Sequence, residues 1–255
     1  MTKRYCLFFL LSGLLITATA CQAAGPTETS IPIIETKEEL PDPTQTMPEP
    51  APSPTPTLAP SPTPEPSPTP HTILRQDDFS DVNSGWERYQ QFDGVLDYVI
   101  EEETYQMNVL AEESLWYVWL EEDLADVILS VDAWQAAGPE DVLYGVLCRF
   151  DADLRNGVVF LINGQGQAAV GLMENNFQPL PGGALTQFDA IQTGLNVKNT
   201  IEASCVGESL IMTVNGERLF EIPSPGSIGN DFGLAVRTTD SGADIRFDNL
   251  TLYAP

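Results

Sequence analysis

The sequence predicts an all-β domain in which two antiparallel sheets pack face to face. Short runs rich in Val, Ile, Leu and aromatic residues recur towards the C-terminus, separated by Gly, Asn and Asp. Two Asn-Gly pairs stand between neighbouring runs, as they do in hairpin turns. No segment shows a sustained helical period, so strands and turns account for the folded part of the chain.

The expected strands follow one another along the domain, at 126–134, 143–150, 157–164, 199–206, 209–214 and 244–253. Asn215-Gly216 predicts a type I′ turn, because both central residues of that turn need positive φ. Asn163-Gly164 predicts a second hairpin of the same kind. The aromatic stretch EESLWYVWLEEDLAD, at 112–126, is expected to be a strand followed by a turn.

Four stretches carry a resemblance to a known family: DDFSD…SGW, YGVLCRFD, LIMTVNGERL and DIRFDNLTLY. With them, residues 74–254 resemble concanavalin A-like (laminin G-like) jelly rolls, and in particular the 3-keto-disaccharide hydrolase-like domains of bacterial surface proteins. The resemblance implies a two-sheet jelly-roll sandwich. Because its motifs are mostly turns and strand ends, it says more about the fold than about an activity.

The first 20 residues have the pattern of a secretory signal peptide: a basic start, an apolar run at about 7–16, and small residues. The ending Ala-Thr-Ala-Cys resembles the bacterial lipobox, although Ala18 stands where Leu is commoner. That resemblance implies that Cys21 is acylated and becomes the mature N-terminus. The alternative is an ordinary signal peptide cut near Ala20 or Ala24.

Residues 21–72 form a Pro/Thr/Ser-rich segment that holds 15 of the 21 prolines of the chain. It has little apolar surface to bury, so we expect it to be disordered. Alternating prolines favour extended polyproline II, which would let the segment span on the order of 100 Å or more as a stalk. A Pro-rich segment can also serve as a ligand for aromatic-lined grooves.

The folded domain, residues 73–255, is strongly acidic. It holds 30 acidic and 8 basic residues, a formal charge of −22. Such a surface repels phosphate backbones and anionic lipids, which excludes nucleic acid as a partner and leaves the N-terminal lipid as the only membrane contact. We expect a monomer in the cell envelope, exposed on the extracytoplasmic side.

Cysteines 148 and 205 remain after the signal peptide and the lipid site are set aside. Strand alternation places both among inward-pointing apolar residues, one set on each strand: Tyr144, Val146, Cys148 and Phe150, and Ile201, Ala203 and Cys205. An exported chain meets oxidising conditions, which favours a disulfide between them. A pair of buried free thiols is the alternative.

Catalytic chemistry has few candidate residues. His71 is the only histidine, so His-dependent nucleophilic arrangements and His-based zinc sites are not expected. Some glycosidases of this fold use Glu-x-Asp-x-x-Glu on a strand, but the match here has Ser130 and Gln135 in the glutamate positions and retains only Asp132. A second partial match offers Glu121, Asp123 and Asp126 in an acidic turn. We therefore expect that the chain is not an enzyme.

A binding surface has better candidates. Alternation along 126–134 puts Ser130, Asp132 and Trp134 on the face opposite the core, a combination that suits stacking on a sugar ring. Tyr117 and Trp119 are expected to extend this surface. The alternatives are that Trp134 packs under a loop and that Trp116 and Trp119 belong to the core. We expect no cofactor; the one alternative is structural calcium at Asp78 and Asp248, which recurs in related sandwiches.

These features together indicate a lipid-anchored surface protein that displays a non-catalytic jelly-roll module, with carbohydrate as its ligand. Two alternatives stay open: an envelope domain that binds another protein or acts as a scaffold, and a divergent glycoside hydrolase.

Overall fold

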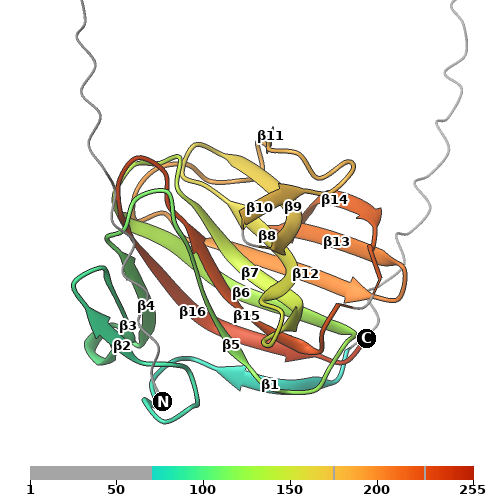
Figure 1. Cartoon of the computed structure of the whole chain (residues 1–255), viewed down its shortest axis with the longest axis horizontal. Helices are drawn as coiled ribbons and strands as arrows, with labels where there is room; N and C mark the ends of the chain where they lie inside the picture. The colour runs from blue at the N-terminus through green and yellow to red at the C-terminus, as the bar shows by residue number, and fades with distance from the viewer. Residues whose placement is uncertain (1–70, 175, 227) are drawn as a thin grey trace, which may run out of the picture. The chain divides into compact units, whose positions relative to one another are not determined.

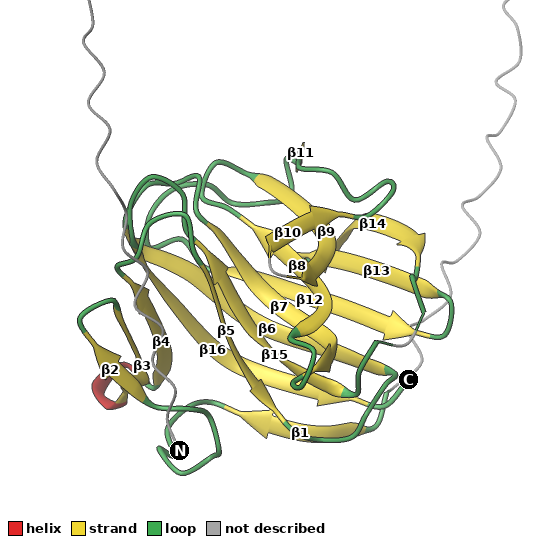
Figure 2. Cartoon of the chain, viewed as in Figure 1, coloured by secondary structure: helices red, strands yellow, loops and turns green. Residues whose placement is uncertain are grey.

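The computed structural model describes residues 71–174, 176–226 and 228–255. This part of the chain folds into two antiparallel sheets that lie one over the other (Figure 1). Figure 2 shows that its regular structure is almost entirely strand, with one short 3₁₀ helix, η1 (Ile100–Glu102), beside β2 and β3. No helix of the described ranges is long and apolar enough to cross a membrane. The predicted signal peptide, Cys21 and the stalk up to residue 70 lie outside the described residues.

The larger sheet has nine strands in the order β14-β13-β12-β6-β16-β4-β3-β2, and β1 pairs with the C-terminal half of β16. Its strands are β1 (Ile73–Asp77), β2 (Tyr89–Gln91), β3 (Gly94–Val99), β4 (Thr104–Val109), β6 (Val127–Ala137), β12 (Asn199–Val206), β13 (Ser209–Val214), β14 (Glu217–Pro223) and β16 (Ala243–Tyr253).

The smaller sheet has seven strands in the order β10-β9-β8-β7-β15-β5, and β11 pairs with β9. Its strands are β5 (Leu115–Leu120), β7 (Leu143–Asp151), β8 (Asn156–Ile162), β9 (Gln167–Glu174), β10 (Asn176–Pro179), β11 (Thr186–Gln187) and β15 (Asp231–Arg237). The predicted all-β, two-sheet fold is confirmed.

The main core lies between the two sheets, and strand alternation supplies it. Leu129, Val131 and Ala133 of β6 are fully buried there, as their period-two spacing predicts. From the smaller sheet, Phe160 and Leu234 belong to the same cluster. Because the inward residues of β6 are fixed in this way, Ser130, Asp132 and Trp134 must point away from the core.

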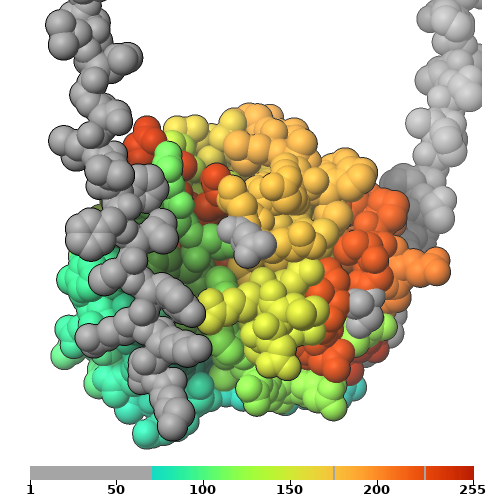
Figure 3. All heavy atoms as spheres, viewed as in Figure 1, coloured from blue at the N-terminus to red at the C-terminus, as the bar shows by residue number. Residues whose placement is uncertain are grey.

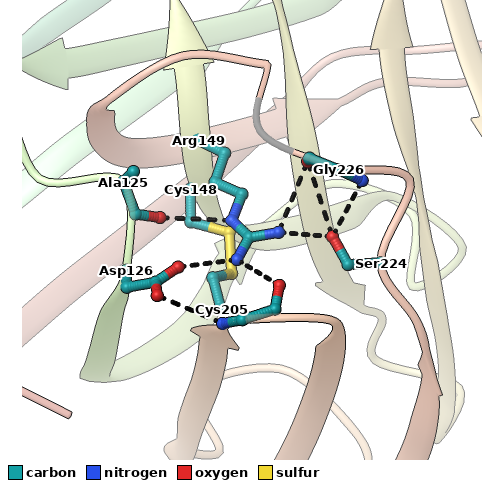
Figure 4. The surroundings of a disulfide bond; sticks show 8 residues. Ala125, Asp126, Cys148, Arg149, Cys205, Ser224 and Gly226 are labelled. Carbon is teal, nitrogen blue, oxygen red and sulfur yellow. Dashed lines mark hydrogen bonds and ion pairs between the residues drawn. A yellow bond between two sulfur atoms is a disulfide. The ribbon is translucent and has the colours of Figure 1, made fainter.

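A disulfide joins the two sheets, because Cys148 lies on β7 and Cys205 on β12. Both cysteines are fully buried in the main core. The predicted bridge is confirmed. Figure 4 shows the guanidinium of Arg149 beside it, with groups from several loops converging on that side chain.

Arg149 interrupts the regular pleat of β7. It adopts a left-handed φ of 50°, and the pairing registers of β7 shift between Cys148 and Asp151. The extra residue turns Phe150 to the outer face of the smaller sheet, where it joins a second apolar cluster. The prediction that Phe150 shares the inward face with Cys148 was therefore wrong, because simple alternation does not count a bulge.

Hydrogen bonds from every nitrogen of its guanidinium hold Arg149 in this conformation. Nε donates to the Ala125 carbonyl (3.1 Å) and Nη2 to Asp126 (2.7 Å). The remaining acceptors are the Gly207 carbonyl, the Ser224 hydroxyl and the Gly226 carbonyl. These bonds compensate for the burial of the charge, since Arg149 is 2% exposed.

The two Asn-Gly turns differ. Asn215 and Gly216 both have positive φ, 51° and 84°, which agrees with the predicted type I′ turn. Asn163 and Gly164 instead begin a four-residue connection between β8 and β9, in which Gly166 takes the left-handed conformation (φ 86°). The Asn163 side chain accepts hydrogen bonds from the backbone of Gln165 and Gln167, and so stabilises the longer loop.

Candidate functional site

Trp134 lies on the outer face of the nine-stranded sheet, on its central strand β6. The strand has β12 on one side and β16 on the other. Trp134 is half-buried, as are Ser130 and Asp132, which point the same way. The three residues that the sequence grouped on one polar face therefore do share it. We call this surface, with Lys198, Thr200, Asp248 and Asn249 around it, the Trp134 face.

Lys198 lies over one face of the Trp134 indole ring. Its Nζ lies 4.6 Å from the centroid of the Trp134 ring, within cation–π range. The same ammonium lies 2.9 Å from Asp248 and 3.9 Å from Asp132. A single lysine thus connects the aromatic ring to both carboxylates and fixes their relative positions.

Asp132 acts as a hydrogen-bond acceptor on both oxygens. The Thr200 hydroxyl donates to its Oδ1 (2.6 Å), and the amide of Asn249 donates to its Oδ2 (3.1 Å). Asp132 and Asp248 are register partners across β6 and β16, so the sheet brings a second carboxylate to the site. Sequence reasoning missed this neighbour because it had assigned Asp248 to calcium.

Arg246 extends the polar surface on the other side of Trp134, which is its register partner. Its Nε donates to Asp244 (3.0 Å) and its Nη1 to Glu102 (2.9 Å). Gln106 also donates to Asp244 (2.7 Å). Ordered donors and acceptors therefore flank Trp134, and they come from the strands β12, β16 and β4 and from η1.

Tyr117 and Trp119 do not extend this surface. Both lie on β5, which belongs to the seven-stranded sheet, whereas Trp134 lies on the nine-stranded sheet. Their rings pack at a tilt against Phe150, with centroid distances of 5.2 Å and 5.3 Å, on the outer face of the smaller sheet. The expected link was wrong because the topology places β5 and β6, though close in sequence, in different sheets.

Apart from Ser130, Asp132 and Asp248, the residues predicted for catalysis or calcium lie away from the Trp134 face. Gln135 is fully buried, and its amide donates to the Pro139 carbonyl (2.7 Å), so it anchors a turn. Asp78 accepts from the Ser80 hydroxyl (2.6 Å), and this bond lowers the pKa of Asp78. Asp248 faces Lys198. Within the described ranges, no three His, Cys, Asp or Glu side chains are grouped so that they could hold a metal ion.

The acidic turn after β5 lines a different hollow. Glu121 and Asp123 border an open cavity of about 600 Å³ together with Asp231, and Asp126 instead pairs with Arg149. Burial raises the pKa of Asp231, and the charges of Glu121 and Asp123 add to that shift. The Asn230 amide donates to Asp123 there (2.8 Å), but no aromatic ring with a cation over it, such as Trp134 with Lys198, is among the described residues that line this hollow.

No protein-family model matches the chain, and no curated protein sequence matches it. The structure is nevertheless similar to solved jelly-roll domains. One is the carbohydrate-binding module CBM66 from Bacillus subtilis, with a TM-score of 0.52 and 15% identity over 67% of this chain and 96% of that one.

Two further structures are similar. A Bacillus subtilis protein of unknown function with a galectin-like fold has a TM-score of 0.53 and 11% identity, over 71% of this chain and 96% of that one. The catalytic domain of an endo-1,3-β-glucanase (laminarinase) from Thermotoga petrophila has a TM-score of 0.51 and 8% identity, over 72% and 98%. At these identities the likeness shows the jelly-roll fold alone. The narrower resemblance to 3-keto-disaccharide hydrolase-like domains stays a prediction.

Proposed function

We propose that the chain is a lipid-anchored surface protein whose jelly-roll domain binds carbohydrate on the Trp134 face and does not cleave it. The observation that carries this proposal is the half-buried indole of Trp134, which Lys198 holds among Asp132, Thr200 and Asn249. An aromatic ring offers an apolar face on which a sugar ring can stack, and oriented donors and acceptors beside it can fix the orientation of the sugar. The likeness of the fold to CBM66, a carbohydrate-binding module, is consistent with this function.

The polar groups of this face are preorganised. Asp132 is held by Thr200 and Asn249, so a hydroxyl that donates to it would meet a carboxylate already in position. A ring-stacking contact contributes about 0.5–1.5 kcal/mol, by analogy with aromatic pairs in proteins. A face with one such ring should bind a neutral saccharide weakly.

Hydrolysis is the second candidate, and the pairing of Asp132 with Asp248 is what favours it. Glycosidases need one carboxyl group that donates a proton and another that acts as nucleophile or base. Here Asp132 accepts from Thr200 and Asn249, and Lys198 faces both carboxylates. Neither group is placed as a proton donor, which supports binding without cleavage. Sugar release that disappears in Asp132→Asn would establish the hydrolase instead.

The test is a titration of the full chain with a panel of neutral oligosaccharides. Trp134→Ala should weaken binding about tenfold, the equivalent of about 1.4 kcal/mol. Phe92→Ala is the matched control, because Phe92 is an aromatic residue that is 92% exposed on the β2–β3 turn, away from this face.

Two results would contradict the proposal. Unfolding of Trp134→Ala would show that the ring is a packing residue. Absence of binding by wild-type protein at millimolar sugar would favour an envelope protein as the partner.

A further inference from the structure

The outer face of the seven-stranded sheet carries a second aromatic surface, independent of the Trp134 face. Its floor is made of small residues, so rings can lie close to the backbone. A Cβ on Gly171 would come within 2.5 Å of the Phe177 ring, and a Cβ on Gly157 within 3.1 Å of Phe150. Tyr117 in turn packs against Phe150, at 5.2 Å between centroids. Figure 3 views the molecule from the side of this sheet, where the β7–β8 turn (yellow) projects below the β9–β11 region (orange).

A cavity of about 250 Å³ opens beside Tyr117. It is lined by Leu115, Tyr117, Arg155, Met173 and Glu174. Its volume is slightly below the range of about 300–1,000 Å³ typical of drug-sized ligands, and suits a single sugar ring. The lining combines an aromatic ring and apolar side chains with one cation and one carboxylate.

The charges at this face distinguish it from the rest of the domain. Six of the eight basic residues of the domain pair with a carboxylate. Within the described ranges, Arg155 and Arg237 form no such pair. Arg155 lines the cavity, and Arg237 is the register partner of Leu115, which also lines it. Both unpaired guanidinium groups therefore lie at the same apolar surface.

The polar groups of the cavity are held by the β7–β8 hairpin. Asp151 accepts hydrogen bonds from the backbone of Asp153 and Leu154, both at 2.9 Å, and so orders the turn that ends at Arg155. Asn156 donates to Glu174 at 3.4 Å. Arg155 is exposed, so its guanidinium is accessible to a ligand in the cavity.

We infer that this cavity is a second saccharide site, and that it takes a pyranoside bearing a carboxylate, such as a uronic acid. The ring would stack on Tyr117, its carboxylate would accept hydrogen bonds from Arg155, and a hydroxyl would donate to Glu174. Arg237 adds positive potential nearby. In a domain with a formal charge of −22, these two arginines are what would allow an anionic sugar to bind here at all.

The experiment compares two probes, methyl β-glucuronide and methyl β-glucoside, titrated into the full chain. The wild type should bind the glucuronide about tenfold more tightly, because a charge-assisted hydrogen bond is roughly twice as strong as a neutral one. Arg155→Gln should abolish this preference. Arg218→Gln is the matched control, because Arg218 is exposed and paired with Glu221 on the other sheet, and it should keep the preference. Salt should weaken glucuronide binding more than glucoside binding.

The outcomes separate this site from the Trp134 face. Trp134→Ala should leave the glucuronide preference unchanged, whatever its effect on neutral sugars. Equal affinity of the wild type for both probes, or an unchanged preference in Arg155→Gln, would overturn the inference. Loss of the preference in Trp134→Ala would also overturn it, since the carboxylate would then be read on the other sheet. Tyr117→Phe keeps the aromatic ring on which the sugar would stack, so it should fold normally and keep the preference for the glucuronide.

Discussion

The disulfide between Cys148 and Cys205 should supply a large share of the stability of the domain. It closes a loop of 57 residues in sequence and joins β7 to β12 across the core. In the chain-entropy model, a loop of this length contributes about 4 kcal/mol by restricting the unfolded chain. Domains of this size have unfolding free energies of about 5–15 kcal/mol, so reduction should remove a quarter or more of the total.

The cleanest perturbation is reduction of the wild-type chain, because both sulfur atoms stay in the core. Oxidised protein and protein refolded from denaturant with a reductant would be unfolded in urea and followed by tryptophan fluorescence. The reduced form should have a lower midpoint and a larger dependence on urea, since its unfolded state is less restricted and exposes more surface.

The variant Cys148→Ala/Cys205→Ala should lose at least as much stability as reduction does, because it also removes two buried sulfur atoms. A difference below about 1 kcal/mol between the oxidised and reduced forms would refute the reasoning, and would mean that Arg149 and its partners hold the two sheets together without the bridge.

Two further predictions concern alkaline pH and the N-terminus. Burial raises the pKa of Tyr144 and of Tyr105, so both phenols stay neutral in the folded state while they ionise in the unfolded state; the free energy of unfolding should therefore fall as pH rises above about 10. Melting temperatures measured from pH 8 to 11 should fall less for Tyr144→Phe than for the wild type. An equal fall in both proteins would contradict this prediction. Metabolic labelling with a fatty acid should mark the wild type and not Cys21→Ser. The variant should also be shed from the cell, because stable anchoring needs the acyl chains. Equal labelling of both proteins would exclude Cys21 as the attachment point.

The sequence predicted the strands and the inward faces well because period-two alternation is a local property. Leu129, Val131 and Ala133 are buried as their spacing requires. The bridge between Cys148 and Cys205 was predicted from the same alternation together with the expected export of the chain. The side chain of Phe150 could not be placed in this way. Its direction depends on the bulge at Arg149, whose partners come from three separate connections: β5–β6, β12–β13 and β14–β15.

The candidate site was predicted in part, for a related reason. Trp134, Asp132 and Ser130 share one strand, so their common face could be read locally. The hydrogen-bond partners of Asp132 could not be predicted locally. Thr200 and Asn249 lie 68 and 117 residues away from it in the chain and come close to it only because β6 lies between β12 and β16. Tyr117 and Trp119 lie on the other sheet because β5 pairs with β15, which no local pattern indicates.

The most direct test of the account follows the four tryptophan indole N–H signals of the full chain by NMR during titration with a neutral oligosaccharide that it binds. Single substitutions would assign the signals of Trp86, Trp116, Trp119 and Trp134. If the sugar binds on the Trp134 face without being cleaved, the Trp134 signal shifts progressively, the other three stay in place, and the sugar is recovered intact. A shift confined to Trp119, or release of shorter sugars, would contradict that proposal.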